Sequence, residues 1–474
     1  MKLLVIALYF FIIVVIGVIA SKSVKNTKDF VLGGRKFNAV TTALGAGAAD
    51  MSAWLMMGLP GAVYLYGASE MWLPIGLSVG AYLNWQFVAR RLRVYTQKYG
   101  NSLTIPSYLA NRFSDASGAI KVTAVVTMFM FFMLYIASAL IALAVLINTF
   151  TNFEYTYCLW FGAAFIFVYT SIGGFVAVTW SDVMQGSLML FALIVVPIAI
   201  VTSQGSISTA YNNFQALDIN TSNPFLNMSV IGIISLLSWG IGYFGQPHIL
   251  VRFMAIKQSR VMNVSQKICM GWMILSLIGA FCVGLFGKVL FNADEGINPE
   301  SIFLLAADRL FPEWLAGVVL AAVLSAIMST ISSQLHAISC SLAELDFKYK
   351  ASHKIWHTRS FMFLVVTIST LFAHKPNNTI LGLVSVAWAG LGSAFGPVIL
   401  LSLYFNKVTK QGAMYGMITG GVTVIIWHSL KEFGGIFELY EIIPGFILSS
   451  IVIFIQCSIF SKTSVSRKTN ENVK

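Results

Sequence analysis

The stretch that decides the fold is Gly45-Ala46-Gly47-Ala48-Ala49-Asp50-Met51-Ser52-Ala53-Trp54, followed closely by Gly58-Leu59-Pro60-Gly61. It lies inside an apolar run over 40–66, yet it carries a carboxylate and many small residues. A charged side chain at membrane depth is costly and marks a functional site by default. Small residues let the backbone leave helical geometry, which is tolerated at that depth only where it lines a cavity or is buried in protein. We therefore predict a cation site that uses Asp50 and freed backbone carbonyls.

A second interruption reads Ser238-Trp239-Gly240-Ile241-Gly242-Tyr243-Phe244-Gly245-Gln246-Pro247-His248, at the end of the apolar run over 226–248. Three glycines and a proline loosen the backbone beside two large aromatic side chains, which suits a small organic ligand with an apolar face. Ordinary interfacial Trp and Tyr would give the same composition, and the residues alone favour neither interpretation. Trp239, Tyr243 and Pro247 follow one another at intervals of four, so we expect them along one side of a helix.

The composition of the 474 residues places both interruptions in a membrane protein. Apolar residues make up 57% and charged residues 10%, and the mean hydropathy is +0.80. A soluble domain carries about 25% charged residues, so a soluble or disordered chain is excluded. The long unbroken apolar runs also differ from the alternating pattern of a membrane β-barrel. We predict an all-α polytopic protein with about thirteen transmembrane helices, near 3–20, 40–66, 71–89, 120–148, 156–178, 185–203, 226–248, 268–287, 314–343, 360–373, 379–405, 412–428 and 442–460.

The distribution of charge predicts the orientation. With the N-terminus outside and the C-terminus inside, 25 of the 30 Lys and Arg fall on the cytoplasmic side, in the loops over 21–39, 90–119, 249–267, 344–359 and 406–411, in the tail over 461–474 and at Lys121. The loop over 179–184 is cytoplasmic as well. Basic residues gather inside in membrane proteins. The net charge of +12 is therefore a topology signal, and we expect no nucleic-acid partner.

The two interrupted spans lie five spans apart, and this spacing predicts the architecture. The spans over 40–203 and over 226–405 form two halves of five helices with opposite topology, as in inverted-repeat secondary transporters. We predict one transporter domain over 1–460, with a peripheral first helix, two peripheral helices over 412–460 and a cytoplasmic tail over 461–474. No GxxxxGK[ST] loop is present, and no loop is long enough for a catalytic domain, so we expect neither an enzyme nor an ATP-driven pump.

One helical face in the run over 314–343 carries Ala326, Ser329, Thr330 and Ser333 at the spacing i, i+3, i+4, i+7. Hydroxyls and a bent backbone there can offer oxygens to a small hard cation. Ser and Thr also bond back to their own helix or join helices together, and the residues alone favour that simpler interpretation.

The chain resembles the sodium:solute symporter family from about residue 5 to residue 460. The resemblance rests on an ordered series of motifs: Leu32-Gly33-Gly34-Arg35, Asp50-Met51-Ser52 with Gly58-Leu59-Pro60-Gly61-Ala62, Arg91-Leu92-Arg93, Gly173-Gly174-Phe175, Trp180-Ser181-Asp182, the 239–248 motif, Trp388-Ala389-Gly390-Leu391-Gly392 and Phe395-Gly396-Pro397. Glycine-rich patches alone would be weak, but the matched order and spacing are strong.

The resemblance implies a leucine-transporter-type core of 5+5 helices with sodium between the first broken core helix and the eighth. The carbonyls of Ala48, Met51 and Ala326 and the hydroxyls of Ser329 and Thr330 would then bind the ion. Asp50 would support that binding, Na⁺ would be the coupling ion, and no cofactor is implied.

The 239–248 motif favours the proline branch of the family, and the resemblance then implies import of L-proline by alternating access in a bacterial plasma membrane. The solute site would be lined by Tyr135, Trp239, Tyr243 and Pro247, with Ser52 and Trp54 close to both sites. Arg35 and Asp182 would act in gating or coupling. Beyond proline, Na⁺ and the lipid bilayer, no obligate protein partner is implied.

Two departures from the family pattern affect these expectations. Ala49 and Ala53 stand where the proline branch usually has Ser and Gly, which affects ion or solute affinity and solute size. Three alternatives stay open: another small solute such as pantothenate, proton coupling through Asp50, and a channel or membrane sensor. The paired breaks favour alternating access over the continuous polar pore of a channel. The short tail leaves no room for a sensor's signalling domain.

Overall fold

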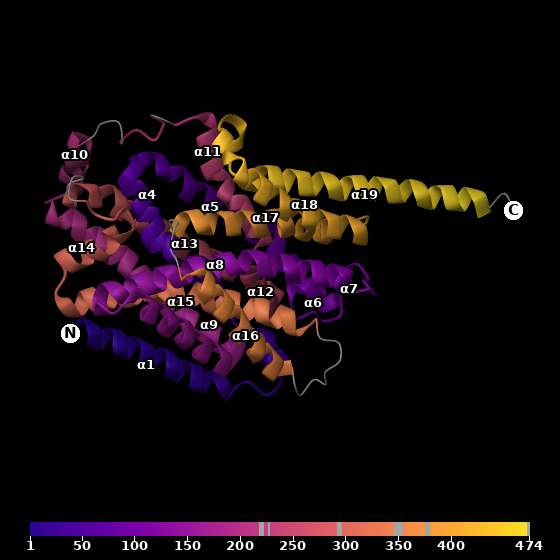
Figure 1. Ribbon diagram of the computed structural model, residues 1–474, viewed down its shortest axis with the longest axis horizontal. Helices are drawn as coiled ribbons and strands as arrows, with labels where there is room; N and C mark the ends of the chain where they lie inside the picture. Colours follow the sequence, from indigo (N-terminus) through magenta and orange to yellow (C-terminus); the bar gives the residue numbers. More distant parts are fainter. Residues whose placement is uncertain (218–221, 226–227, 292–295, 346–353, 375–379, 472–474) are drawn as a thin grey trace.

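The computed structural model describes residues 1–217, 222–225, 228–291, 296–345, 354–374 and 380–471. Figure 1 shows a bundle of helices that run mostly along one axis, with the N-terminus and the C-terminus toward opposite ends, which we call the N-terminal and C-terminal ends of the bundle. Over the described residues the chain is all-α, as predicted. The extended backbone there pairs in one isolated parallel bridge, between Phe37 and Ile256.

The helices are α1 (Lys2–Ser21), α2 (Thr27–Leu32), α3 (Ala39–Asp50), α4 (Leu59–Tyr66), α5 (Trp72–Asn84), α6 (Arg90–Lys98), α7 (Ile105–Arg112), α8 (Ala119–Thr151), α9 (Tyr155–Ser203), α10 (Ile207–Leu217), α11 (Val230–Ser238), α12 (Pro247–Ala255), α13 (Met262–Leu290), α14 (Ile302–Leu310), α15 (Glu313–Ala343), α16 (Lys354–Phe372), α17 (Ile380–Tyr404), α18 (Lys410–Ser429) and α19 (Ile442–Glu471). Within the described ranges, seven helical segments are long and apolar enough to cross a membrane, and a bent pair could make an eighth. The protein is therefore a multi-pass membrane protein. Parts of the predicted spans over 226–248 and 379–405, and of the tail, lie outside the described residues.

Both predicted interruptions are present. α3 ends at Asp50, Met51 leaves helical geometry (φ −81°, ψ 84°), and a π-helical turn, η2 (Trp54–Gly58), leads into α4. The second break joins α11 through a 3-10 segment, η6 (Trp239–Gly245), to α12, and the two axes differ by 48°. Helix α5 packs closely against this second break at Gly80. Glycine is required at that position because an added Cβ would lie 2.0 Å from the Gly240 carbonyl oxygen.

Two predicted connections are wrong. The residues over 179–184 are helical, and the chain instead kinks at Gly174 within α9, where φ is 54° and ψ is −145°. A side chain there would also meet Phe30, since an added Cβ would lie 2.6 Å from its ring. The predicted loop over 249–267 begins with α12, which continues to Ala255. The residues of α12 are buried, so α12 is the second half of the broken span. The hydropathy pattern ends the predicted span before this second half.

Within the predicted tail over 461–474, α19 continues as a helix to Glu471. At the centre of the bundle, α15 is buried along nearly its whole length. It packs against α1, α3, α8, α9 and α16. α15 is therefore one of the elements, with α9, α12 and α13, against which the first half of the broken helix, α3, rests.

Candidate ion and solute site

An oxygen cluster lies where the first break meets α15. The Ser329 hydroxyl oxygen is 2.7 Å from the Ala48 carbonyl oxygen and 3.1 Å from that of Ala326. The Thr330 hydroxyl donates to the Ala326 carbonyl at 3.3 Å. All four residues are fully buried. Hydroxyl and carbonyl oxygens are the ligands that hard cations prefer. The Ala48 carbonyl lies in the last turn of α3, where the helix offers it no donor, and the Ser329 hydroxyl satisfies this buried acceptor.

Met51 belongs to the same break. It is buried and is the first residue after α3 with non-helical geometry, so its carbonyl does not continue the helical hydrogen-bond pattern. The structure thus brings Ala48, Ala326, Ser329 and Thr330 into one cluster and places Met51 three residues from Ala48 at the broken end. These residues fit a sodium ion by the chemistry of their oxygens.

Asp50 is held by the second break. The Tyr243 hydroxyl donates a short hydrogen bond to Oδ2 of Asp50, while Oδ1 is buried without a hydrogen-bond partner among the described residues. The Trp54 indole N–H donates to the Asp50 carbonyl at 3.1 Å. A buried carboxylate with a free oxygen is costly unless a cation or proton compensates it. The carboxylate therefore joins the two broken helices and keeps one acceptor open.

Tyr135 of α8 faces the same region. Its hydroxyl lies near the Asp50 carboxylate and the Ser52 hydroxyl, and it is buried without a well-formed hydrogen bond to the described residues. The Ser52 oxygen is also 3.5 Å from the Trp54 backbone nitrogen. Three of the residues expected to bind solute, Tyr135, Ser52 and Trp54, thus gather around Asp50.

The expectation that Trp239, Tyr243 and Pro247 share one side is wrong. The segment between them is a 3-10 helix with about three residues per turn, so a spacing of four no longer repeats a direction. Trp239 lines a large open cavity, Tyr243 a cavity of about 10 Å³ with Asp50, and Pro247 a separate cavity of about 20 Å³. In this conformation the three side chains do not form one pocket.

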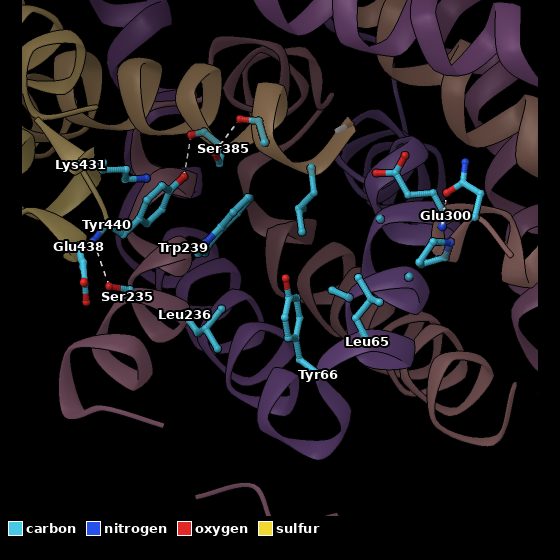
Figure 2. A pocket seen from close by; sticks show the side chains of 17 residues that line it. Leu65, Tyr66, Ser235, Leu236, Trp239, Glu300, Ser385, Lys431, Glu438 and Tyr440 are labelled. Atoms are coloured by element: carbon cyan, nitrogen blue, oxygen red, sulfur yellow. Dashed lines mark hydrogen bonds between the residues drawn. The ribbon is translucent and has the colours of Figure 1, made fainter. Parts of the chain in front are cut away.

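The large cavity has a volume of about 700 Å³ and lies between α4, α11, the start of α17 and the segment that joins α18 to α19. Figure 2 shows Tyr66 and Leu65 on one side, Glu300 on another, and Lys431, Glu438 and Tyr440 on a third. Tyr440 lies against Trp239 with ring centroids 5.1 Å apart and an angle of 19°. The Trp239–Tyr440 pair forms one wall of this cavity.

A buried ion pair joins α12 to α9. Nη2 of Arg252 is 2.7 Å from Oδ2 of Asp182, and both side chains are almost completely buried. Arg252 also donates to Thr179 at 2.6 Å and to Ser333 of α15 at 2.5 Å. One cation therefore connects three elements, and Ser333 lies one helical turn beyond Ser329 and Thr330.

Arg35 contacts the C-terminal end of α12, close to Arg252. Its guanidinium donates to the Met254 carbonyl at 2.6 Å and to the Ser102 carbonyl at 2.8 Å. Arg93 of α6 donates to the Ile256 carbonyl at 2.7 Å. Burial lowers the pKa of Arg35 to about 10, and the charge of Arg93 adds to this. Arg35 still carries its proton at neutral pH, and the two arginines hold the C-terminal end of α12.

Sequence reasoning missed three residues of this region. Arg252 was counted with a loop, although its apolar flanks in Ile249-Leu250-Val251 and Phe253-Met254 signal burial. Trp388 of α17 donates from its indole N–H to the Trp239 carbonyl at 2.8 Å, and its ring meets Tyr243 edge-on at 5.1 Å. Tyr440 gave no signal in the sequence, because only tertiary packing brings it to Trp239.

Comparison with known proteins establishes the family of the chain. The family model described as "Sodium:solute symporter family" matches residues 30–420. The chain belongs to the sodium:solute symporter family. As a member of the sodium:solute symporter family, it is a transporter that couples a solute to sodium and not an enzyme.

Relatives within the sodium:solute symporter family cover nearly the whole chain. The sodium/proline symporter of Escherichia coli K12 is 45% identical over 461 residues, which cover 94% of this chain and 91% of that protein. The high-affinity proline transporter PutP of Bacillus subtilis 168 is 45% identical over 450 residues, covering 93% and 94%.

Two solved structures share the fold. A Na⁺-coupled sialic acid symporter in a substrate-bound outward-open state aligns with a TM-score of 0.81 at 19% identity, covering 97% of this chain and 98% of that one. Mhp1, a nucleobase-cation-symport-1 family transporter in a closed conformation, aligns with a TM-score of 0.55 at 9% identity, covering 87% and 91%.

Proposed function

We propose that this protein imports L-proline together with Na⁺ across a bacterial plasma membrane by alternating access. The observation that carries the proposal is the oxygen cluster of Ala48, Ala326, Ser329 and Thr330 at the first break. The solute assignment draws on the relatives named as proline transporters.

We also propose thirteen membrane crossings, with the N-terminus outside and the C-terminus in the cytoplasm. Two observations support this arrangement: the termini lie toward opposite ends of the bundle (Figure 1), which requires an odd number of crossings, and the basic residues gather on one side. The proposed core is a leucine-transporter-type inverted repeat over 40–203 and 226–405, within one transporter domain over 1–460. The first helix and the two helices over 412–460 are peripheral.

In the proposed mechanism Na⁺ binds to the carbonyls of Ala48, Met51 and Ala326 and to the hydroxyls of Ser329 and Thr330. Binding replaces the hydrogen bonds from these hydroxyls to the carbonyls, so the ion bridges α3 and α15. Asp50 supports the ion through its charge, and its hydrogen bond from Tyr243 links ion binding to the second break.

The solute lies between the breaks in this mechanism, with its ring against aromatic walls and its charged groups facing the broken helix ends. Tyr135, Trp239, Tyr243 and Pro247 line the site, and Ser52 and Trp54 connect it to the ion. Because these side chains line separate cavities here, binding brings them together. Arg35 and the Asp182–Arg252 pair hold α12 while the opposite side opens.

Uptake of labelled proline into proteoliposomes tests the proposal. Proline is a net-neutral zwitterion near pH 7, so each Na⁺ adds one positive charge, and an inside-negative potential of 100 mV supplies roughly 2.3 kcal/mol per charge. We expect uptake that needs an inward sodium gradient and rises with this potential. Uptake that follows an imposed proton gradient without sodium would favour the proton-coupled alternative. Sodium-driven uptake of pantothenate but not of proline would overturn the assignment of proline as the solute.

A further inference from the structure

The large open cavity ends at the Trp239–Tyr440 pair. Tyr440 is 4% exposed and Trp239 is 7% exposed, although the cavity beside them has a volume of about 700 Å³. The cavity of about 10 Å³ beside Asp50 and Tyr243, four residues beyond Trp239 in the chain, has room for about one water molecule. The two stacked rings therefore separate a vestibule large enough for a small solute from the buried polar residues.

Tyr440 is fixed in place by three elements of the vestibule wall. Its hydroxyl donates to the Ser385 carbonyl of α17 at 2.7 Å, and its backbone N–H donates to the Ser235 hydroxyl of α11 at 2.9 Å (Figure 2). Its ring stacks on Trp239 at the start of η6. These three elements flank the second break, so Tyr440 holds its ring across that break.

The segment over 430–441 that carries Tyr440 is itself anchored to α18. The buried Glu441 carboxylate is 2.7 Å from Nζ of Lys431 and 3.3 Å from Nδ1 of His428. The Trp427 indole N–H donates to the Leu439 carbonyl at 3.0 Å. A ring held on both sides in this way is pre-organised and keeps its position with little loss of entropy.

A column of contacts connects Tyr440 to the ion region. Trp239 accepts a hydrogen bond from Trp388, Trp388 meets Tyr243 edge-on, and the Tyr243 hydroxyl donates to Asp50. A change at the Tyr440 end of the column can thus reach the carboxylate through packed side chains and the Trp239 backbone carbonyl.

We propose that Tyr440 is a specificity-determining residue of the transporter: with Trp239 it closes the outer side of the solute site and limits the size of the ring that enters. This inference rests on the proposed function for the identity of the solute. A solute coming from the vestibule must separate the two rings, and the restored stack then retains it. The peripheral helices α18 and α19 take part in solute selection through the loop that joins them.

Uptake in proteoliposomes compares Tyr440→Ala, Tyr440→Leu and Tyr440→Phe at matched amounts of protein in the membrane. Loss of one aromatic contact corresponds to about fivefold to tenfold in an equilibrium constant. We expect Tyr440→Ala and Tyr440→Leu to raise the KM for proline by about that factor with little change in the maximal rate. Tyr440→Phe keeps the ring and stays near the wild-type value. Phe433→Ala, in the same segment but 78% exposed, is the matched control.

The relative affinity for solutes of different ring size distinguishes a Tyr440 lid, which closes the outer side of the solute site, from a merely structural role of this residue. The six-membered ring analogue of proline inhibits uptake more strongly, relative to proline, in Tyr440→Ala and Tyr440→Leu than in the wild type or in Tyr440→Phe. Unchanged KM and unchanged relative inhibition in Tyr440→Leu would overturn the proposal. If Tyr440→Ala does not reach the membrane, Tyr440→Leu and Tyr440→Phe decide the question.

A measurement without solute distinguishes failure of this inference from failure of the proposed function. Cys269, which lines the small cavity beside Asp50 and Tyr243, is kept in a chain whose other four cysteines are replaced, and a membrane-impermeant maleimide is added from outside. We expect labelling about tenfold faster when Tyr440→Ala is added, the same scale as loss of the stack. Equal rates would overturn the lid. If labelling is faster but the wild-type protein does not take up proline, the role of Tyr440 as a lid is supported and the assignment of proline as the solute is rejected.

Discussion

The Ser329 hydroxyl of α15 lies 2.7 Å from the Ala48 carbonyl oxygen at the end of α3, although the two residues are 281 positions apart in sequence. This contact joins a broken helix to α15, which is buried along nearly its whole length. An ion held by both oxygens would break this hydrogen bond and change the contact between these two helices directly.

Removal of either α15 hydroxyl should weaken sodium binding. For Ser329→Ala and Thr330→Ala we expect the sodium concentration for half-maximal uptake to rise by about tenfold, the scale of one lost polar interaction. Because sodium stabilises only a protein that binds it, the melting temperature should also rise less on exchange of KCl for NaCl. Ser341→Ala is the control, since that hydroxyl donates to Ala337 of its own helix. An unchanged sodium dependence in Thr330→Ala would exclude that residue as a ligand.

Loss of the Asp50 charge should affect sodium before it affects the solute. We expect Asp50→Asn to raise the half-maximal sodium concentration, and high sodium to restore part of the proline affinity, because the two ligands are coupled reciprocally. Tyr243→Phe removes the donor to Asp50 but keeps the ring against Trp388. Its effect should resemble that of Asp50→Asn and be smaller. Tyr108→Phe, which loses a buried hydroxyl contact with Ser402, is the control and should leave the sodium dependence as it was.

The Asp182–Arg252 pair should be far more sensitive to loss of one member than of both. Asp182→Asn or Arg252→Gln leaves a buried charge without its partner, which costs about 3–5 kcal/mol. The double variant removes both charges and should lose less stability than the sum of the single variants. Thermal unfolding in detergent measures the stability of the purified wild type, both single variants and the double variant. Additive losses would show that the two charges do not interact.

The contacts at the C-terminal end of α12 should keep that end closed. For Arg93→Ala we expect labelling of Cys340 from the cytoplasmic side to be about fivefold faster, in line with one lost hydrogen bond. Cys340 is 2% exposed and lines the small cavity beside Pro247, so it reports opening without an added cysteine. The other four cysteines are replaced for this test. Arg90→Ala, an exposed neighbour on α6, is the control, and equal labelling of both variants would argue against a closing role for Arg93.

The sequence by itself determined the membrane class and the positions of both breaks. These features have local causes. Long apolar runs must be helical in a bilayer because no water satisfies the backbone there, and glycine, proline and Asp50 mark the places where a helix cannot continue. The family motifs added the partner face on α15, which hydroxyl spacing alone did not assign to an ion.

Only the tertiary structure decided which way the side chains of the second break point. A 3-10 segment turns by a different angle per residue than an α-helix, so Trp239, Tyr243 and Pro247 face three cavities instead of one. Arg252 looked like a loop cation until its partner Asp182 was placed beside it. Tyr440 shows the same limit, because stacking on a ring 201 positions earlier in the chain depends on how helices pack and leaves no periodic trace in the sequence.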